Sequence, residues 1–194
     1  MKTNTKTGKV VGLGLFTAIV VVLQLLGSFI KFGTFSITLV LAPIVIGAAL
    51  YGIGAGAYLG LVFGATVLIS GDAAAFLTIN PIGTVIIVLL KGMLAGLTAG
   101  LVYSLISKAS SLAGVIVAGV VCPIVNTGIF LAGCYIFFQE WLVAVFGTTG
   151  FVTVVAGLVT INFAIELGIN MVLSTAIVKI IDLGKKQLNS KTKA

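Results

Sequence analysis

The sequence contains no histidine and no arginine, and its 194 residues include only two cysteines, Cys122 and Cys134. A structural zinc site needs four nitrogen or sulfur ligands, so this composition excludes one. The missing histidine also excludes serine–histidine and cysteine–histidine catalysis. The two cysteines lie 12 positions apart in one apolar run. That spacing is about 18 Å along a helix, too far for a disulfide, so we interpret both as small packing residues.

Charged residues are also scarce, at 8% of the chain, whereas hydrophobic residues make up 60%. A water-soluble domain carries about 25% charged residues. With a mean hydropathy of +1.32, the chain cannot cover a water-facing surface, and we predict an all-α integral membrane protein. A membrane enzyme would need a nucleophile, an acid–base pair or a metal cluster. The sequence offers no such set, so we expect no catalysis, no metal and no cofactor.

Apolar segments separated by short breaks predict a compact bundle of six transmembrane helices, since about 20 residues span a bilayer core. The predicted spans are residues 9–30, 37–51, 54–70, 84–106, 112–138 and 152–181. We expect a single membrane domain over residues 1–194, with short basic tails at 1–8 and 183–194. The longer breaks, at 31–36, 71–83 and 139–150, fall on one side of the membrane and are the expected place for a bound molecule.

The lysines are divided unevenly between the two sides of this topology. Lys31 lies in one of the longer breaks, and Lys91 falls inside a span. The other nine lie on the opposite side: Lys2, Lys6, Lys9, Lys108, Lys179, Lys185, Lys186, Lys191 and Lys193. Because cytoplasmic segments carry an excess of basic residues, we predict that both termini are cytoplasmic. The basic tails are then topology anchors rather than nucleic-acid-binding faces.

Glycines recur every four residues in two of the predicted spans. One ladder is Gly52, Gly56, Gly60 and Gly64, and the other is Gly92, Gly96 and Gly100. Residues four apart share a helix face, and small residues let membrane helices approach closely. We interpret these two ladders as internal packing faces. In the first span, Gly14 and Ala18 form a similar pair, for which docking of a partner membrane protein is the more plausible interpretation.

Polar residues inside the predicted spans are the main candidates for a site. A lysine such as Lys91 at mid-membrane costs about 3 kcal/mol, so it needs a partner or a wet cavity. The last span supplies a polar stripe at four-residue spacing, Asn162, Glu166, Asn170 and Ser174, and Asn126 follows Pro123 in the fifth. Either Lys91 and Glu166 form a buried ion pair, or these groups line a cavity where Lys91 meets an anionic or accepting ligand group. We favour the ligand.

The break at 71–83 is the expected lid. Asn80, followed by a proline, favours a turn, and Phe76 offers apolar contact with a bound molecule. We interpret Asp72 as a solvated loop charge. Trp141, in the break at 139–150, is either an anchor at the membrane interface or a stacking cap over a pocket.

The order of several segments resembles the substrate-binding S components of energy-coupling factor (ECF) vitamin transporters. These segments are "GLGLFTAIVVVLQLL" (12–26), "LAPIVIGAALYGIGAGAYLGLVFG" (41–64), "NPIGTVIIVLLKGMLAGLTAGLVYSL" (80–105) and "INFAIELGINMVLSTAI" (161–177). The resemblance implies a subunit in a prokaryotic plasma membrane that captures a vitamin from outside. It further implies docking onto a shared transmembrane coupling subunit and reorientation in the bilayer, driven by two partner ATPases.

In that family an Ala-x-x-x-Ala motif in the first span carries the docking, and here it maps onto Gly14 and Ala18, with glycine in place of the first alanine. The chain has no G-x-x-x-x-G-K-[ST] sequence of its own, as suits a passive binding subunit. Lys91, Asn126, Asn162, Glu166, Asn80 and Phe76 are the candidate substrate-binding residues. Pantothenate, riboflavin, folate and other micronutrients stay open as substrates. The alternative is a self-sufficient secondary transporter or channel that uses Lys91 and Glu166.

Overall fold

The computed structural model describes residues 5–29, 31–32, 35–36, 40–157 and 168. The elements, in chain order, are α1 (Thr5–Ser28), β1 (Lys31–Phe32), β2 (Phe35–Ser36), α2 (Leu41–Tyr51), α3 (Ile53–Ser70), α4 (Ala74–Leu77), α5 (Pro81–Ile106), α6 (Ser111–Phe137) and α7 (Gln139–Phe146). A further helix covers Phe151–Gly157. The two short strands pair as an antiparallel hairpin, and the other elements of the described residues are helices joined by short turns, as the apolar pattern predicts.

Within the described residues, four helices are long and apolar enough to cross a membrane, namely α1, α3, α5 and α6. The count rises to five if α7 and the helix Phe151–Gly157, which meet at a bend of 76°, form one broken span. The predicted span at 37–51 is described only from Leu41, as the 11-residue helix α2. At 1.5 Å per residue, α2 is about 16 Å long and does not span a bilayer core alone.

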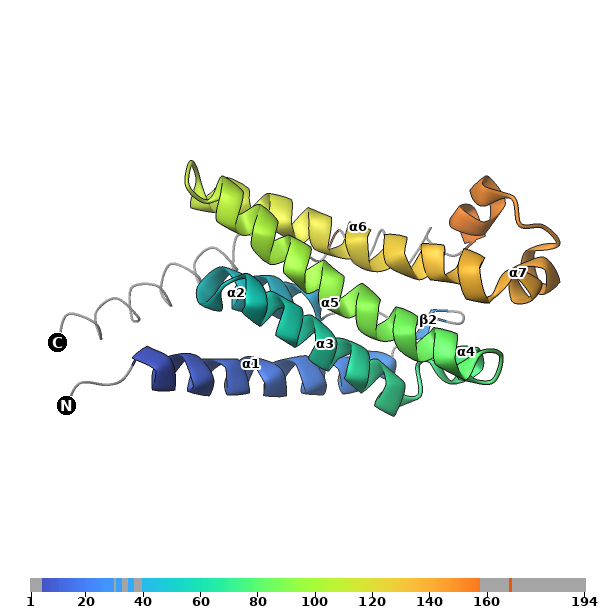
Figure 1. The fold of residues 1–194 in the computed structure, drawn as a ribbon, viewed down its shortest axis with the longest axis horizontal. Helices are drawn as coiled ribbons and strands as arrows, with labels where there is room; N and C mark the ends of the chain where they lie inside the picture. Colours follow the sequence, from blue (N-terminus) through green and yellow to red (C-terminus); the bar gives the residue numbers. More distant parts are fainter. Residues whose placement is uncertain (1–4, 30, 33–34, 37–39, 158–167, 169–194) are drawn as a thin grey trace.

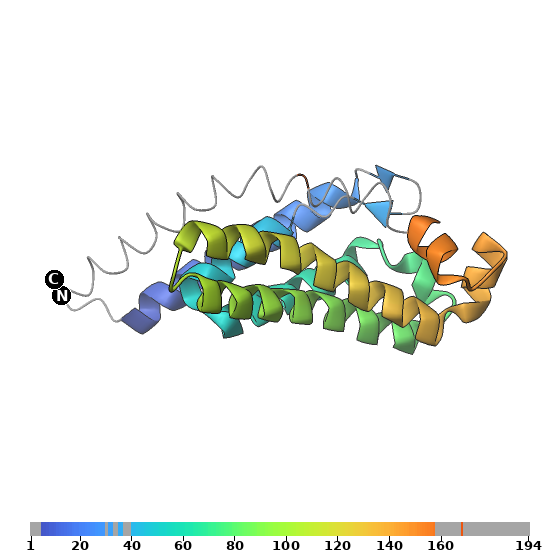
Figure 2. The same cartoon turned by 90° about the horizontal axis from the view of Figure 1, so that it is seen from above.

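The long helices lie beside one another, and their ends gather at two ends of the bundle (Figures 1 and 2). One end holds the start of α1, the turn at Gly52 and the turn at Lys108; we call it the lysine end. The other holds the end of α1, the α3–α5 connection and α7; we call it the acidic end, because Asp72 and Glu140 lie there. Among the described lysines, Lys9 and Lys108 lie at the lysine end, whereas Lys31 lies at the acidic end.

Gly56, Gly60 and Gly64 of the first ladder face the second ladder across the α3–α5 contact, which confirms that these residues form internal packing faces. Gly52 does not belong to this face, because it lies in the turn before α3 and an added Cβ there meets nothing within 4 Å. A side chain at Gly56 would overlap the carbonyl of Gly96, and one at Gly60 would overlap the carbonyl of Gly92. At Gly64 an added Cβ would lie 2.6 Å from the carbonyl oxygen of Val88. The two helices therefore run antiparallel with their backbones in contact over three helical turns, which fixes their register.

Helix α5 packs its opposite side against α6, again antiparallel. An added Cβ at Gly83 would lie 2.8 Å from the ring of Phe137, and one at Gly133 would meet Ile87. At the lysine end, the Tyr103 hydroxyl lies 3.3 Å from the Ser111 hydroxyl. Helix α5 is thus held between α3 and α6, and the face that bears Lys91 looks onto α6.

Large apolar side chains cover the outside of the bundle, as expected for lipid-facing positions. Exposed examples occur on all four long helices: Val10, Leu15, Ile69, Ile82, Leu105, Leu112 and Ile136. A protein in water would keep most such side chains in its core. The interior contains many small and branched residues, including both cysteines, which are fully buried.

Two of the predicted breaks contain helices. The break at 139–150 was expected to be irregular, but its first eight residues form α7. Its apolar residues Leu142 and Phe146 are four apart and pack inward against the core at the acidic end. The break at 71–83 includes α4 and the first turn of α5. Apolar loop residues that can bury one face gain more from a short helix than from an open loop.

Candidate functional site

Aromatic side chains from α4, α6 and α7 meet at the acidic end. We call them the aromatic cluster: Phe76, Phe130, Phe138, Trp141 and Phe146. The Phe76 ring lies 5.5 Å from Phe130, 5.1 Å from Phe138 and 5.1 Å from Trp141, and Trp141 lies 6.2 Å from Phe146. These centroid distances are typical of favourable edge-on and tilted ring pairs. The cluster joins the α3–α5 connection to α7, so both are held over the bundle.

Lys91 lies beneath the aromatic cluster, between two rings from different helices. Its Nζ is 5.3 Å from the centroid of Phe130 on α6 and 5.6 Å from that of Phe63 on α3. Both distances fall within cation–π range. The ammonium group is therefore stabilised and held at a defined place inside the bundle.

Asn126 is buried on α6, with 5% of its surface exposed. It lies four residues before Phe130 and so shares the same helix face. Its side-chain oxygen Oδ1 has no hydrogen-bond partner among the described residues. A buried acceptor without a donor costs about 1–3 kcal/mol, so this amide is a strong candidate for contact with another molecule.

Asn80 and Phe76 have clear structural roles. The Asn80 side chain caps α5 by accepting a hydrogen bond of 2.9 Å from the backbone N–H of Gly83. The proline that follows it occupies the first position of the helix, where its missing N–H is harmless. Phe76, in α4, lies at the centre of the aromatic cluster. A role of either residue in ligand contact stays a prediction.

Two of the predicted site residues, Asn162 and Glu166, lie outside the described residues, as do Asn170 and Ser174. Among the described candidates, the structure brings Lys91, Asn126 and Phe76 together around Phe130. Asn80 lies at the acidic end, at the start of the helix that carries Lys91. Because Glu166 lies outside the described residues, the ion pair between Lys91 and Glu166 and the ligand contact of Lys91 both stay predictions.

Gly14 and Ala18 both lie on the exposed side of α1. No atom outside the helix comes within 4 Å of a Cβ added at Gly14. Exposed apolar side chains, including Leu15 and Val22, surround the pair. The small residues are therefore not used for packing within the described part of the bundle.

The sequence reasoning missed Phe63 and Phe130 as neighbours of Lys91, and it misread Asp72. Asp72 is not simply a solvated charge: it is half-buried, and its Oδ2 accepts a hydrogen bond of 2.7 Å from Nε2 of Gln24. Gln24 is buried, with 3% of its surface exposed. An uncharged polar residue in the middle of an apolar run was the signal for this contact.

The Gln24–Asp72 hydrogen bond ties α1 to the connection that carries Phe76. Replacing Gln24 with leucine removes a bond to a carboxylate, which contributes about 1.5–3 kcal/mol. We expect hydrogen exchange at the backbone amides of residues 73–79 to accelerate about tenfold or more, as measured by mass spectrometry.

Ser28→Ala is the matched control on the same helix, because the Ser28 hydroxyl bonds only locally, to the carbonyl of Leu25 at 2.7 Å. It should leave exchange at 73–79 unchanged. Equal exchange in Gln24→Leu and the wild type would show that the bond does not hold the connection in place.

Comparison with known proteins gives one match. A family model described as "ECF transporter, substrate-specific component" matches residues 9–178, which is most of the chain. No curated protein and no solved structure matches the sequence.

Proposed function

The chain belongs to the substrate-specific components of ECF transporters, and from this premise we propose that it captures a vitamin or related micronutrient outside the cell. The family is one of transporter subunits rather than enzymes. The protein then hands the molecule to a transmembrane coupling subunit. Two partner ATPases use ATP, and this chain needs no cofactor of its own.

The observation that best supports a binding role is the position of Lys91. A charged lysine is held between Phe63 and Phe130, beneath the aromatic cluster, and the buried Asn126 lies one helical turn from Phe130 on α6. Small-molecule sites typically have a small number of polar groups surrounded by apolar and aromatic side chains. In this proposal Lys91 and Asn126 contact the substrate, together with Asn162 and Glu166 of the last span. Phe76 and the Asn80 turn belong to the segment that closes over it.

The proposed topology has six spans, with both termini in the cytoplasm of a prokaryotic cell. The distribution of charge supports it, because Lys9 and Lys108 lie at the lysine end, whereas Asp72 and Glu140 lie at the acidic end. By the positive-inside rule the lysine end faces the cytoplasm. The aromatic cluster then faces the outside, where the substrate arrives.

Helix α1 is the proposed docking surface for the coupling subunit. Gly14 and Ala18 leave a shallow strip on its exposed side, and a partner helix can pack closely against such small residues. Replacing both with leucine should abolish co-purification with the coupling subunit and the ATPases. Substrate affinity should stay within about threefold of the wild type, because neither residue packs inside the bundle.

Gly54→Leu is the matched control, since an added Cβ at exposed Gly54 meets nothing within 4 Å. It should leave co-purification intact. Retention of the partners by the Gly14→Leu/Ala18→Leu protein would place the docking surface elsewhere.

Uptake into proteoliposomes tests the proposed function. The purified chain alone should bind its vitamin but accumulate none inside the vesicles. Accumulation should require the coupling subunit, the ATPases and ATP. Uptake by the chain alone, driven by a proton or sodium gradient, would instead support the self-sufficient transporter.

A further inference from the structure

The register between α5 and α6 places Lys91 and Asn126 on facing sides of one contact. Ile87 of α5 lies against Gly133 of α6. Lys91 lies one turn after Ile87 on α5, and Phe130 lies one turn before Gly133 on α6. The Lys91 Nζ is 5.3 Å from the centroid of the Phe130 ring. Extending this antiparallel register by one more turn pairs Ala95, which is fully buried, with Asn126. Asn126 is therefore about one helical turn, or 6 Å, deeper in the bundle than Lys91.

These two side chains offer opposite hydrogen-bonding chemistry. The Lys91 ammonium is a donor only and carries a positive charge. The Asn126 Oδ1 is an acceptor that has no donor among the described residues. Ala95 has no polar side-chain atom to supply one. A molecule that contacts both groups favourably presents an acceptor, best an anion, near Lys91 and an N–H or O–H about one turn deeper.

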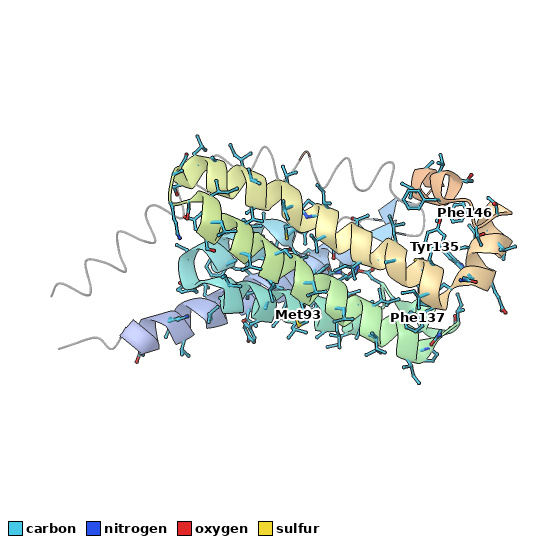
Figure 3. The ribbon with its side chains drawn as sticks, turned by 45° about the horizontal axis from the view of Figure 1, so that its top comes forward. Met93, Tyr135, Phe137 and Phe146 are labelled. Atoms are coloured by element: carbon cyan, nitrogen blue, oxygen red, sulfur yellow. The ribbon has the colours of Figure 1, made fainter. Side chains whose placement is uncertain are left out.

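The Tyr135 hydroxyl is a second buried oxygen without a partner among the described residues. It does not belong to the same face. Tyr135 lies nine residues after Asn126, which is half a turn around the helix, and its ring stacks on Phe151 at 6.3 Å. Tyr135 and Phe146 lie at the acidic end, whereas Met93 on α5 lies nearer the middle of the bundle (Figure 3). The Tyr135 hydroxyl therefore does not share a face with Asn126.

Building on the proposed function, we infer that the substrate is a compact carboxylate that also carries a hydroxyl or amide hydrogen-bond donor. Its carboxylate lies at Lys91, and its donor end is bound deeper, at the Oδ1 of Asn126. A cationic substrate is disfavoured because it would bring a second positive charge beside Lys91. The donor end enters first, and the carboxylate stays beneath the aromatic cluster.

Matched pairs of probes test this inference in the purified protein. Pantothenate is paired with panthenol, and biotin with biotinamide. In each pair the second molecule lacks the carboxylate but keeps the hydrogen-bond donors at the other end. Thiamine is the cationic probe. Binding affinities are measured by isothermal titration calorimetry. At least one of the two carboxylates should bind about 10–100-fold more tightly than its neutral analogue, because a hydrogen bond between charged groups is lost in the analogue.

Two variants separate the two contacts. In Lys91→Met the preference for the carboxylate over its neutral analogue should shrink to less than about threefold. Asn126→Leu should weaken both members of the pair by a similar factor of about 5–10, because both carry the donor. Asn126→Leu keeps the side-chain volume and removes an unpartnered acceptor, so its folding should be normal, as checked by its melting temperature.

The inference is overturned if neither carboxylate binds, if thiamine or a neutral analogue binds as tightly, or if folded Asn126→Leu binds both members like the wild type. The proposed function fails differently. In that case the chain does not co-purify with a coupling subunit and ATPases, whatever it binds. If the chain co-purifies with its partners but prefers a neutral or cationic probe, the proposed function stands and only the inferred substrate class is wrong.

Discussion

Replacing Gly60 with leucine should lower the melting temperature of the detergent-purified protein by about 6 °C or more. The Cβ of the new side chain would overlap the carbonyl of Gly92, which is backbone and cannot rotate away. Helices α3 and α5 must then separate, at a cost of about 3 kcal/mol or more. Since Phe63 and Lys91 lie on these two helices, substrate binding should be lost as well.

The control for this prediction is Gly54→Leu, on the same helix. An added Cβ at Gly54 meets nothing within 4 Å, so the melting temperature should stay within about 2 °C of the wild type. Similar melting temperatures for Gly60→Leu and Gly54→Leu would mean that the two glycine ladders do not hold α3 against α5.

Replacing Lys91 with methionine should leave the fold intact and weaken substrate binding by about 10–100-fold. Methionine keeps most of the volume and apolar contact of the lysine stem. The lost cation–π contacts contribute about 1–2 kcal/mol, and removing a charge from mid-membrane recovers about 3 kcal/mol, so stability should not fall. Binding falls because the only charge near Phe63 and Phe130 among the described residues is gone.

Lys108→Met is the charge-matched control, since it removes a lysine from the turn between α5 and α6 at the lysine end. Calorimetry should show unchanged binding in this variant. If Lys91→Met fails to insert or unfolds instead, Lys91 is a structural group, and the buried ion pair with Glu166 becomes the better interpretation.

The regular parts of the fold could be predicted from the sequence because they depend on local patterns. Four-residue glycine spacing predicted packing faces, and the structure shows Gly56, Gly60 and Gly64 against α5, although Gly52 lies outside the contact. Helix α7 was missed because polar residues and glycines around 139–150 resemble a loop. Its helical form depends on burial of Leu142, which a local pattern does not reveal.

The site was predictable only in part. Lys91 was conspicuous as a cation in an apolar run, but its aromatic neighbours come from α3 and α6, far away in the sequence. Pairing the two ladders with Gly60 opposite Gly92 would have brought Phe63 close to Lys91. Gln24 stood out as a polar residue in an apolar run, but its partner Asp72 could not be predicted, because the contact depends on how α1 lies against the end of α3.

The central claim is that the chain is a substrate-binding subunit that depends on partners for transport. Native mass spectrometry of the assembly isolated through a tag on this chain tests it most directly. We expect one copy of the chain with a larger membrane subunit and two ATPases, and a released chain that carries one small organic molecule. A chain that appears without partners and without a bound molecule would contradict the claim.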